Sequence, residues 1–554
     1  MKKHRLHPIA WRGPIALAQD YARRYGVTPP DAIAGPTLER LKDELWWRRA
    51  IRKAHGRTVE ATARDLGLVH KGAGIYSSDE TLCRRRGQKT RNRKMLEEVF
   101  AVNEEGQEFT LAELSDLSVS NPAIRRGELM VRIAGFEAVA DGLDHAGEFI
   151  TMTCPSRYHA YTIKNGRSFR NRKFDPILTP RQGQEYLSKV WSRIRAKLAR
   201  HDIRLYGFRV AEPNHCGCPH WHMLVFMPKG MREFVLEVFS HYALEDSPNE
   251  PGADKHRVTF KAIDKTKGTA AGYIAKYIAK NIDGFALDAD SYGGDPIEAS
   301  ERVDAWASCW GIRQFQQLGG PPVSVWRELR RMDWCEEGTI EVVRAAADAG
   351  DWAAYVEAMG GPLVSRKALP LRPAYLQEIK TETGELPLNK YGELSPGRMV
   401  GIQALWMDTP IITRWHKWEF KRGFADLNKE IQVSSVGDGS RSSFCCEGKG
   451  EGDYRNGGNI DGVAGGVAGA GAEFQKDGRM ERPGDAGNKV LAFKWETEKG
   501  LKLQPWKGPL VCPIPRGLGW NSFQVSREPA YPWSTVNNCT QRAVKCPPQE
   551  RGCI

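Results

Sequence analysis

The chain has 554 residues, more than one hydrophobic core usually supports, so we expect two or three domains. Its formal net charge of +13 indicates a polyanionic partner, with nucleic acid the first candidate and solubility charge the plain alternative. The sequence has no apolar run of roughly 18 residues and no secretory signal, and its 12 cysteines are scattered, which excludes a membrane span and predicts a reduced, cytoplasmic protein.

Residues 1–130 are predicted to form a basic, mostly helical N-terminal region. Residues 41–53 have helical periodicity, with the basic residues gathered late in the segment. Residues 83–94 form a dense positive run, which favours contact with DNA phosphates. The alternative for this run is the solvated face of a helix.

Residues 131–300 show the clearest pattern and begin with a short β-branched strand at 149–153. Apolar residues then recur at helical spacing, namely Tyr186, Val190, Trp191, Ile194 and Leu198. A strand at 204–211 follows, and a turn rich in proline and glycine separates it from an apolar strand at 220–227.

The same region continues with an amphipathic helix at 231–242, an alternating strand at 256–262 and a helix at 272–281. The predicted order is β-α-β-β-α-β and then α, which is the split-βαβ, ferredoxin-like arrangement of an α+β fold. In that topology the strand at 149–153 lies beside the strand at 220–227.

Two histidines in the strand at 220–227 predict a metal site. His220 and His222 are two residues apart, so they point to one face of the sheet, and two imidazoles on one face can share one metal ion. Glu212 lies across the tight turn and is preferred as the third ligand, because a carboxylate with two imidazoles suits Mg²⁺ or Mn²⁺. His215 is the alternative third ligand.

A zinc site built from His215, Cys216 and Cys218 is a further alternative for the turn. The spacing of its two cysteines differs from the usual pattern of structural zinc sites.

Tyr273 and Tyr277 lie four residues apart, on one face of the predicted helix at 272–281. They could be core aromatics, but Lys276 and Lys280 flank them, and a nearby lysine stabilises a phenolate. A tyrosine oxygen can attack phosphorus as a nucleophile, and a metal ion stabilises the charge that develops. Two tyrosines about 6 Å apart on a helix could take turns in such a reaction.

Residues 301–430 are predicted to be a helical, DNA-contacting region that combines aromatic and basic side chains. The residues that carry this pattern are Trp306, Trp310, Arg313, Phe315, Trp326, Arg327, Arg330 and Arg331. Aromatic and arginine side chains suit single-stranded DNA, although the tryptophans could equally fill a core. Residues 431–554 form a predicted C-terminal tail that is largely flexible, with a Gly-rich stretch at 457–471.

The order of the strand at 149–153, the Pro-His-Trp-His segment at 219–222 and the paired tyrosines resembles the motifs of HUH endonucleases with two tyrosines. More closely, the chain resembles the bacteriophage replication gene A protein family over roughly residues 60–430. The similar segments are 127–137, 154–159, 272–281 and 310–323, and residues 536–540 resemble family C-termini.

The resemblance implies a site- and strand-specific DNA endonuclease and ligase that nicks an origin through a 5′-phosphotyrosine intermediate. Such an enzyme starts rolling-circle replication of phage or prophage DNA in the bacterial cytoplasm, acts on single-stranded or supercoiled origin DNA and works with a host replicative helicase. The Cys-Gly-Cys turn at 216–218 departs from the family pattern. Two alternatives are a two-tyrosine transposase or conjugative relaxase, and a non-catalytic DNA-binding protein with a structural metal.

Overall fold

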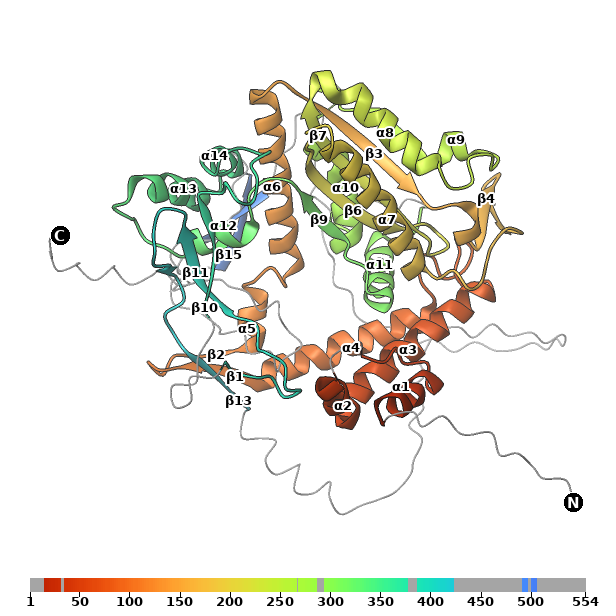
Figure 1. Cartoon of the computed structure of the whole chain (residues 1–554), viewed down its shortest axis with the longest axis horizontal. Coiled ribbons are helices and arrows are strands. Elements are labelled where there is room, and N and C mark those ends of the chain that lie inside the picture. The colour runs from red at the N-terminus through yellow and green to blue at the C-terminus, as the bar shows by residue number, and fades with distance from the viewer. Residues whose placement is uncertain are drawn as a thin grey trace, which may run out of the picture. The chain divides into compact units, whose positions relative to one another are not determined.

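The computed structural model describes residues 14–30, 34–266, 268–285, 293–376 and 386–422, and the backbone of residues 491–496 and 500–505. The described residues up to Arg422 belong to one compact unit, and the hairpin of β14 (Leu491–Glu496) and β15 (Gly500–Pro505) belongs to a second. The protein is mixed α+β with antiparallel sheets, as the sequence predicts (Figure 1). The predicted flexible stretch at 457–471 lies outside the described residues.

A five-stranded antiparallel sheet carries the residues predicted to bind metal. In spatial order its strands are β8 (Val258–Ala262), β3 (His145–Thr153), β7 (Pro219–Pro228), β6 (Tyr206–Pro213) and β9 (Phe315–Leu318). The register places Thr151 of β3 opposite His222 of β7, which confirms that the predicted strand at 149–153 flanks the histidine strand. The edge strand β9 comes from the region predicted to be helical.

One face of this sheet packs against α7 (Pro180–Ala199) and α8 (Arg232–Leu244), which lie side by side in Figure 1. Trp221 of β7 is fully buried on this face. Thr179 and Gln182 form a capping box that starts α7. The apolar positions predicted for this helix are buried or half-buried, namely Tyr186, Val190, Trp191, Ile194 and Leu198.

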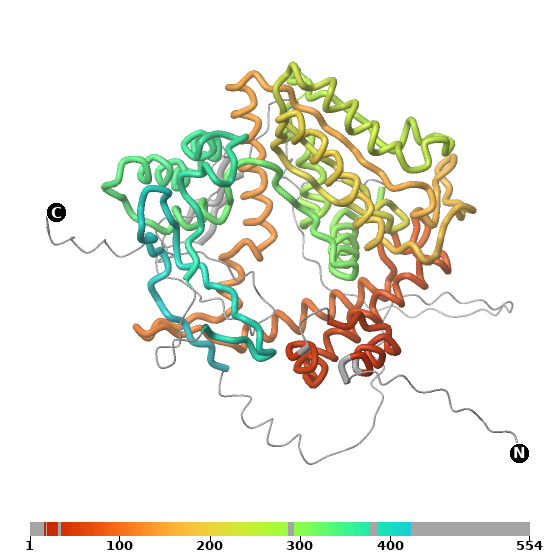
Figure 2. The backbone as a smooth tube through the Cα atoms, viewed as in Figure 1, coloured from red at the N-terminus to blue at the C-terminus, as the bar shows by residue number. Residues whose placement is uncertain are grey.

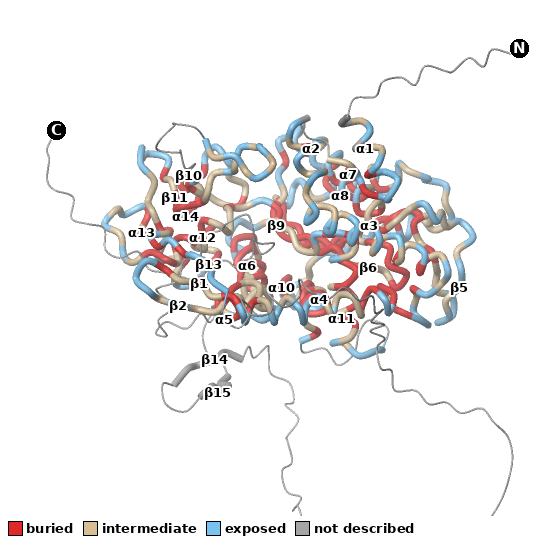
Figure 3. The backbone as a smooth tube through the Cα atoms, turned by 90° about the horizontal axis from the view of Figure 1, so that it is seen from below, coloured by how far each residue is buried: buried red, intermediate tan, exposed pale blue. Residues whose placement is uncertain are grey.

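The other face packs against α6 (Pro122–Gly142) and α10 (Ala270–Ile282). Leu224 and Phe226 of β7 are buried in the cluster that includes both helices. Strand β6 is buried along its whole length, as Figure 3 shows. Because α10 carries the predicted nucleophiles and β7 the predicted ligands, the candidate site lies between this helix and the sheet.

The N-terminal region is helical, as predicted, but it also contains strands. Its helices are α1 (Pro14–Arg24), α2 (Ala34–Lys42), α3 (Glu44–Asp65), α4 (Asp79–Glu98) and α5 (Leu111–Asp116). Strands β1 (Val99–Asn103) and β2 (Glu108–Thr110) form a three-stranded sheet with β13 (Trp418–Arg422). Figure 2 shows this later segment beside β1, although more than 300 residues separate them.

The region predicted as helical after residue 301 is helical only in its first half. It contains α11 (Pro296–Trp310), α12 (Val323–Leu329), α13 (Gly338–Ala349) and α14 (Trp352–Ala358). The prediction is wrong beyond these helices, where β10 (Leu371–Leu376), β11 (Arg398–Ala404) and β12 (Ile411–Ile412) form an antiparallel sheet. Short connecting elements elsewhere are η1 (Ser156–Tyr158), β4 (Tyr161–Lys164), β5 (Arg167–Arg170), η2 (Lys229–Met231) and α9 (Ala253–His256).

The tryptophans of the predicted DNA-contacting region belong to the core. Trp306, Trp310 and Trp326 are each at most 1% exposed. They are therefore not available to stack on DNA bases, and the alternative interpretation of this aromatic pattern is correct. Arginines near these tryptophans also have partners within the protein, since Arg331 is 2% exposed and pairs with Glu328, and Arg327 pairs with Glu128.

The basic run at 83–94 lies on α4 and is largely neutralised within the protein. Arg85 and Lys89 both form ion pairs with Asp304 of α11, and Arg86 pairs with Glu301 of the same helix. These pairs fasten α4 to α11. Because these cations already pair with carboxylates of the protein, the run is less available to bind DNA phosphates than its sequence indicates.

Candidate metal and nucleophile site

Glu212 and His220 face each other across the hairpin of β6 and β7. The turn between the strands closes where the Asn214 N–H donates to the Cys218 carbonyl at 2.7 Å. Gly217 has a φ of +75°, a left-handed conformation that favours glycine. This tight turn brings the carboxylate predicted as third ligand to the two histidines.

The three predicted ligand side chains converge. The Nε2 atoms of His220 and His222 are 2.9 Å apart. The Glu212 Oε2 atom lies 4.0 Å from the first of these nitrogens and 3.8 Å from the second. These ligand atoms all lie within 4.8 Å of one another, and among the described residues they form the one group of this kind.

The imidazoles are in the form that binds a metal ion. Burial, together with the nearby Lys280 ammonium, lowers the pKa of His222 to about 3, and burial also lowers the pKa of His220 well below its usual value. Both rings are therefore neutral near pH 7. Thr151 Oγ1 lies 3.0 Å from Nδ1 of His222, which orients that ring with Nε2 toward Glu212. Two neutral nitrogens and one carboxylate oxygen fit a divalent cation.

Glu212 is held by side chains of α10. The Lys280 Nζ atom donates to Oε2 at 3.0 Å, and the Asn281 Nδ2 atom donates to Oε1 at 2.5 Å. Gln314 in turn donates to Asn281 Oδ1 at 3.2 Å. The ammonium of Lys280 also lies 4.9 Å from the ring centroid of Tyr76. Lys280 was predicted to stabilise a phenolate, but it instead pairs with the candidate ligand carboxylate.

Tyr277 lies against the metal-ligand group. Its ring centroid is 4.0 Å from that of His222 and 5.3 Å from that of Phe149. Burial, and secondly the Glu212 carboxylate, raise the pKa of Tyr277. The expectation that a neighbouring lysine lowers this pKa is therefore not met, because Lys280 is engaged by Glu212.

Tyr273 lies one helical turn earlier, where the helix is more open. Its ring is half-buried against the same hydrophobic cluster as Tyr277. The Nζ atom of Lys261, on the edge strand β8, lies 4.6 Å from the centroid of the Tyr273 ring. Lys276 is exposed, and within the part of the chain that the structure describes it forms no ion pair. The cation at Tyr273 is thus one that the sequence did not suggest.

His215, the alternative third ligand, lies outside the metal-ligand group. It is buried, and burial together with the neighbouring His159 lowers its pKa to about 4. The thiols of Cys216 and Cys218 instead contact opposite nitrogens of the His159 ring, at 3.7 and 3.5 Å. The zinc site considered for this turn is therefore not formed by the described residues.

The turn that joins the ligand strands is held by segments that sequence reasoning missed. The Arg64 side chain (3.1 Å), the Tyr76 backbone N–H (3.3 Å) and the Trp306 indole (2.8 Å) each donate to a carbonyl group of residues 215–217. Tyr76 is fully buried and has a φ of +69°, an uncommon conformation for a bulky residue. No local sequence pattern signals these contacts, because each spans tens of residues or more.

Comparison with known protein families finds a match for the region that contains this site. Residues 21–285 match the family described as bacteriophage replication gene A protein (GPA). This region belongs to the gene A protein family. The match includes the three candidate ligands and both tyrosines.

Several curated proteins are similar to a larger part of the chain. The replication gene A protein of Escherichia phage 186 is 42% identical over 448 residues, which cover 76% of this chain and 63% of that protein. The replication protein of Haemophilus phage HP1 is 41% identical over 421 residues, which cover 74% of this chain and 52% of that protein. A probable replication endonuclease from a prophage-like region of Salmonella typhimurium is 34% identical over 419 residues, which cover 72% of this chain and 50% of that protein.

The chain thus spans between half and two thirds of the length of these relatives. No solved structure matches it. Among the described residues, none of the helices has the length and apolar character needed to cross a bilayer.

Proposed function

We propose that the chain is a site- and strand-specific DNA endonuclease of the two-tyrosine HUH type that initiates rolling-circle replication of phage or prophage DNA. The observation that carries this proposal is the contact between Tyr277 and His222, whose ring centroids are 4.0 Å apart. A tyrosine beside a candidate metal group has the two parts that phosphoryl transfer from DNA requires, a nucleophile and a cation. The names of the relatives, replication protein and replication endonuclease, support the same activity.

The strand order supports the HUH assignment. The four strands β8, β3, β7 and β6 follow one another in space, and helices α7 and α8 connect β3 to β6 and β7 to β8. This is the order of a split-βαβ, ferredoxin-like sheet. Its two middle strands, β3 and β7, carry Thr151 and the two histidines.

The proposed mechanism uses the groups that converge at α10. A divalent cation, Mg²⁺ or Mn²⁺, held by Glu212, His220 and His222 would polarise the scissile phosphodiester. The Tyr277 oxygen attacks phosphorus and loses its proton, the bond from phosphorus to the 3′ oxygen breaks, and that oxygen leaves as a 3′-hydroxyl. One phosphodiester replaces another, so the step is reversible. Tyr273, one helical turn away, can attack the regenerated junction while the first DNA end remains bound.

The lysines of α10 have separate roles in this proposal. Lys280 and Asn281 position Glu212, which they contact directly. Lys276 is exposed and would meet a DNA phosphate only when substrate is bound. The free 3′-hydroxyl would prime DNA synthesis, and a host replicative helicase in the bacterial cytoplasm would separate the strands.

The test is a search for the covalent adduct. The full chain is incubated with Mn²⁺ or Mg²⁺ and with supercoiled plasmids that carry overlapping fragments of the genome encoding it. We expect one fragment to yield nicked DNA with protein attached to its 5′ end, and mass spectrometry of the joined peptide identifies the tyrosine. EDTA should remove the product.

The matched variants are Tyr273→Phe, Tyr277→Phe and the double substitution. The double variant should bind DNA but form no adduct. Adducts formed by the double variant would refute the tyrosine mechanism. DNA binding without any adduct or metal dependence in the unsubstituted chain would identify a non-catalytic binding protein instead.

A further inference from the structure

A small β-hairpin beside the site has no role in the proposed chemistry. Strands β4 and β5 pair with each other and belong to no larger sheet. Their connection, Asn165-Gly166, has φ values of +49° and +75°, as expected for a two-residue turn that matches the twist of a hairpin. Figure 3 shows β5 at the margin of the protein and coloured as exposed. The hairpin is therefore an ordered projection rather than part of the core.

One face of the hairpin is fixed to the N-terminal region. The Tyr161 ring stacks on His70, with centroids 4.5 Å apart. Its cross-strand partner Arg170 donates to the Asp65 carboxylate at 2.8 Å. These contacts use the side chains that point to one side of the ribbon.

The opposite face is basic and exposed. Lys164 and Arg167 lie directly opposite each other across the strands, and Phe169, two residues further along β5, is 49% exposed. No ion pair reaches either cation from the described residues. Like charges in opposite positions destabilise a hairpin, so an anionic partner on this face would relieve a cost that the free protein carries.

The base of the hairpin is joined to the metal-ligand turn. The Asn171 side chain, just after β5, donates to the His159 carbonyl at 2.8 Å. The ring of His159 contacts the thiols of Cys216 and Cys218, and the second of these cysteines is two residues from His220. The exposed ribbon is thus held at a defined place relative to the ligands.

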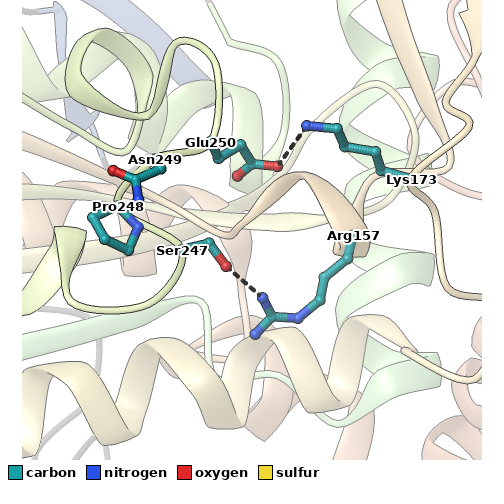
Figure 4. Close-up of a pocket in the computed structure, with 6 residues that line it drawn as sticks. All are labelled: Arg157, Lys173, Ser247, Pro248, Asn249 and Glu250. Carbon is teal, nitrogen blue, oxygen red and sulfur yellow. Dashed lines mark hydrogen bonds and ion pairs between the residues drawn. The ribbon is translucent and has the colours of Figure 1, made fainter.

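A polar pocket lies at this base and helps to hold it (Figure 4). Its lining residues are Arg157, Lys173, Ser247, Pro248, Asn249 and Glu250. Lys173 lies 3.9 Å from Glu250, and Arg157 contacts Ser247 at 3.3 Å and Asp246 at 2.5 Å. Because these charges satisfy one another, the pocket connects the hairpin to the segment after α8 and is not itself the surface to which a partner binds.

We propose that the exposed face of the β4–β5 hairpin binds the phosphate backbone of duplex DNA next to the nick site. The major groove of duplex DNA admits a two-stranded β-ribbon, and Lys164 and Arg167 at its tip would contact phosphates there. Phe169 would supply apolar contact beside the two cations. This inference rests on the proposed function, because it assigns the surface that holds the flanking duplex while α10 acts on one strand.

The test compares Lys164→Ala/Arg167→Ala with Lys189→Ala/Arg200→Ala in the full chain. The control removes one lysine and one arginine that are exposed on and just after α7. Fluorescence anisotropy measures binding to a labelled random-sequence duplex of about two helical turns and to an oligothymidine strand of equal length, over a range of salt concentrations.

We expect the hairpin variant to bind the duplex roughly 10-fold more weakly at moderate salt, with a salt slope smaller by about 1–2, because each lost phosphate contact removes about 0.9 from the slope. The control should resemble the unsubstituted chain with both probes. Oligothymidine binding should change less than twofold in the hairpin variant. Thermal unfolding should not be lowered and should rise slightly if at all, since both side chains are exposed and the substitution removes their mutual repulsion.

Unchanged duplex binding would overturn the proposal, as would an equal loss with duplex and oligothymidine. The adduct assay separates this result from the proposed function. The Tyr273→Phe/Tyr277→Phe chain should retain its duplex affinity while forming no adduct. If the chain never forms adducts but its duplex affinity depends on the hairpin, the proposed nickase activity is refuted and the proposed DNA-binding surface stands.

Discussion

The two ends of α10 differ in what surrounds them, although both carry a tyrosine and a lysine. Toward the C-terminal end, Lys280 is buried against Glu212, and the Tyr277 ring contacts the His222 ring in a tilted arrangement. Toward the N-terminal end, Tyr273 is half-buried and Lys276 is exposed. Both tyrosines are half-buried, so the ends differ in their contacts: Lys280 and Tyr277 contact the candidate ligands, whereas Lys276 is exposed and the Tyr273 ring lies beside Lys261. Equal spacing in a helix therefore does not imply equal roles.

The largest effect should come from the metal-ligand group that defines the buried end. His222→Ala removes one ligand, so we expect adduct formation to fall at least roughly 100-fold, because a bound cation supplies several kcal/mol of charge stabilisation. EDTA should have the same effect on the unsubstituted chain. Calorimetric titration with Mn²⁺ measures the ligand loss directly. Normal adduct formation by His222→Ala would mean that the reaction of Tyr277 does not need a metal ion bound by His222.

Glu212→Gln should also suppress adducts, and it should lower stability because it leaves Lys280 buried without a carboxylate. Breaking a buried ion pair on one side costs about 3–5 kcal/mol. Adding Lys280→Met should recover most of that stability in chemical denaturation, but not the adduct. Recovery of activity in the double variant would mean that Glu212 serves only to neutralise the lysine.

The tyrosines themselves test the contrast between the two ends. Tyr277→Phe should reduce the first cut roughly 10- to 100-fold, since it removes the nucleophile beside the ligands and leaves the more distant one. Tyr273→Phe should leave the first cut nearly intact and impair rejoining. Single-turnover cleavage and re-ligation of trapped DNA measure the two steps. Equal first-cut rates in both variants would mean that the ends of α10 are interchangeable.

Tyr76 offers a smaller test of the buried end, through the ring that faces Lys280. Tyr76→Phe keeps this ring and should change the affinity for Mn²⁺ by less than about twofold. Tyr76→Leu removes a cation–π contact worth about 1–2 kcal/mol when desolvated, so Mn²⁺ affinity should fall roughly 5- to 30-fold. Equal effects of both substitutions would contradict a role for the ring in positioning Lys280.

The smallest effect on adduct formation should come from Lys276, toward the N-terminal end of α10. Lys276→Ala removes an exposed side chain, so stability should change by less than about 0.5 kcal/mol. Adduct formation should fall less than 10-fold, mainly through weaker DNA binding that added salt masks. Thermal unfolding and adduct yield at two salt concentrations check this. A large loss at all salt concentrations would place Lys276 at the reacting phosphate.

Local periodicity predicts much of this sheet and its ligands. Strand alternation places His220 and His222 on one face, and the turn before them brings Glu212 opposite His220. The same reasoning correctly placed the strand that contains Thr151 beside them. These relations involve neighbours in sequence or in a common supersecondary motif, where residue spacing determines geometry.

Partners from distant segments could not be predicted in this way. The spacing of Lys280 on α10 suggested contact with a tyrosine, but Glu212 is its partner because α10 packs against β6. Trp306 looked equally suited to stacking on DNA and to a core, since periodicity alone does not say which face of a helix is covered. The strand β13 pairs with β1 from the other end of the described chain, a pairing without any local signal.

The turn at residues 215–217 has a consequence for the order in which the protein is made. Its donors are Arg64 and Tyr76, which precede it, and Trp306, which follows it. A ribosome releases the chain from the N-terminus, so both histidines and both tyrosines emerge before the last donor has been synthesised. A nascent chain therefore carries every reactive group of the proposed nuclease before its ligand turn is fully held.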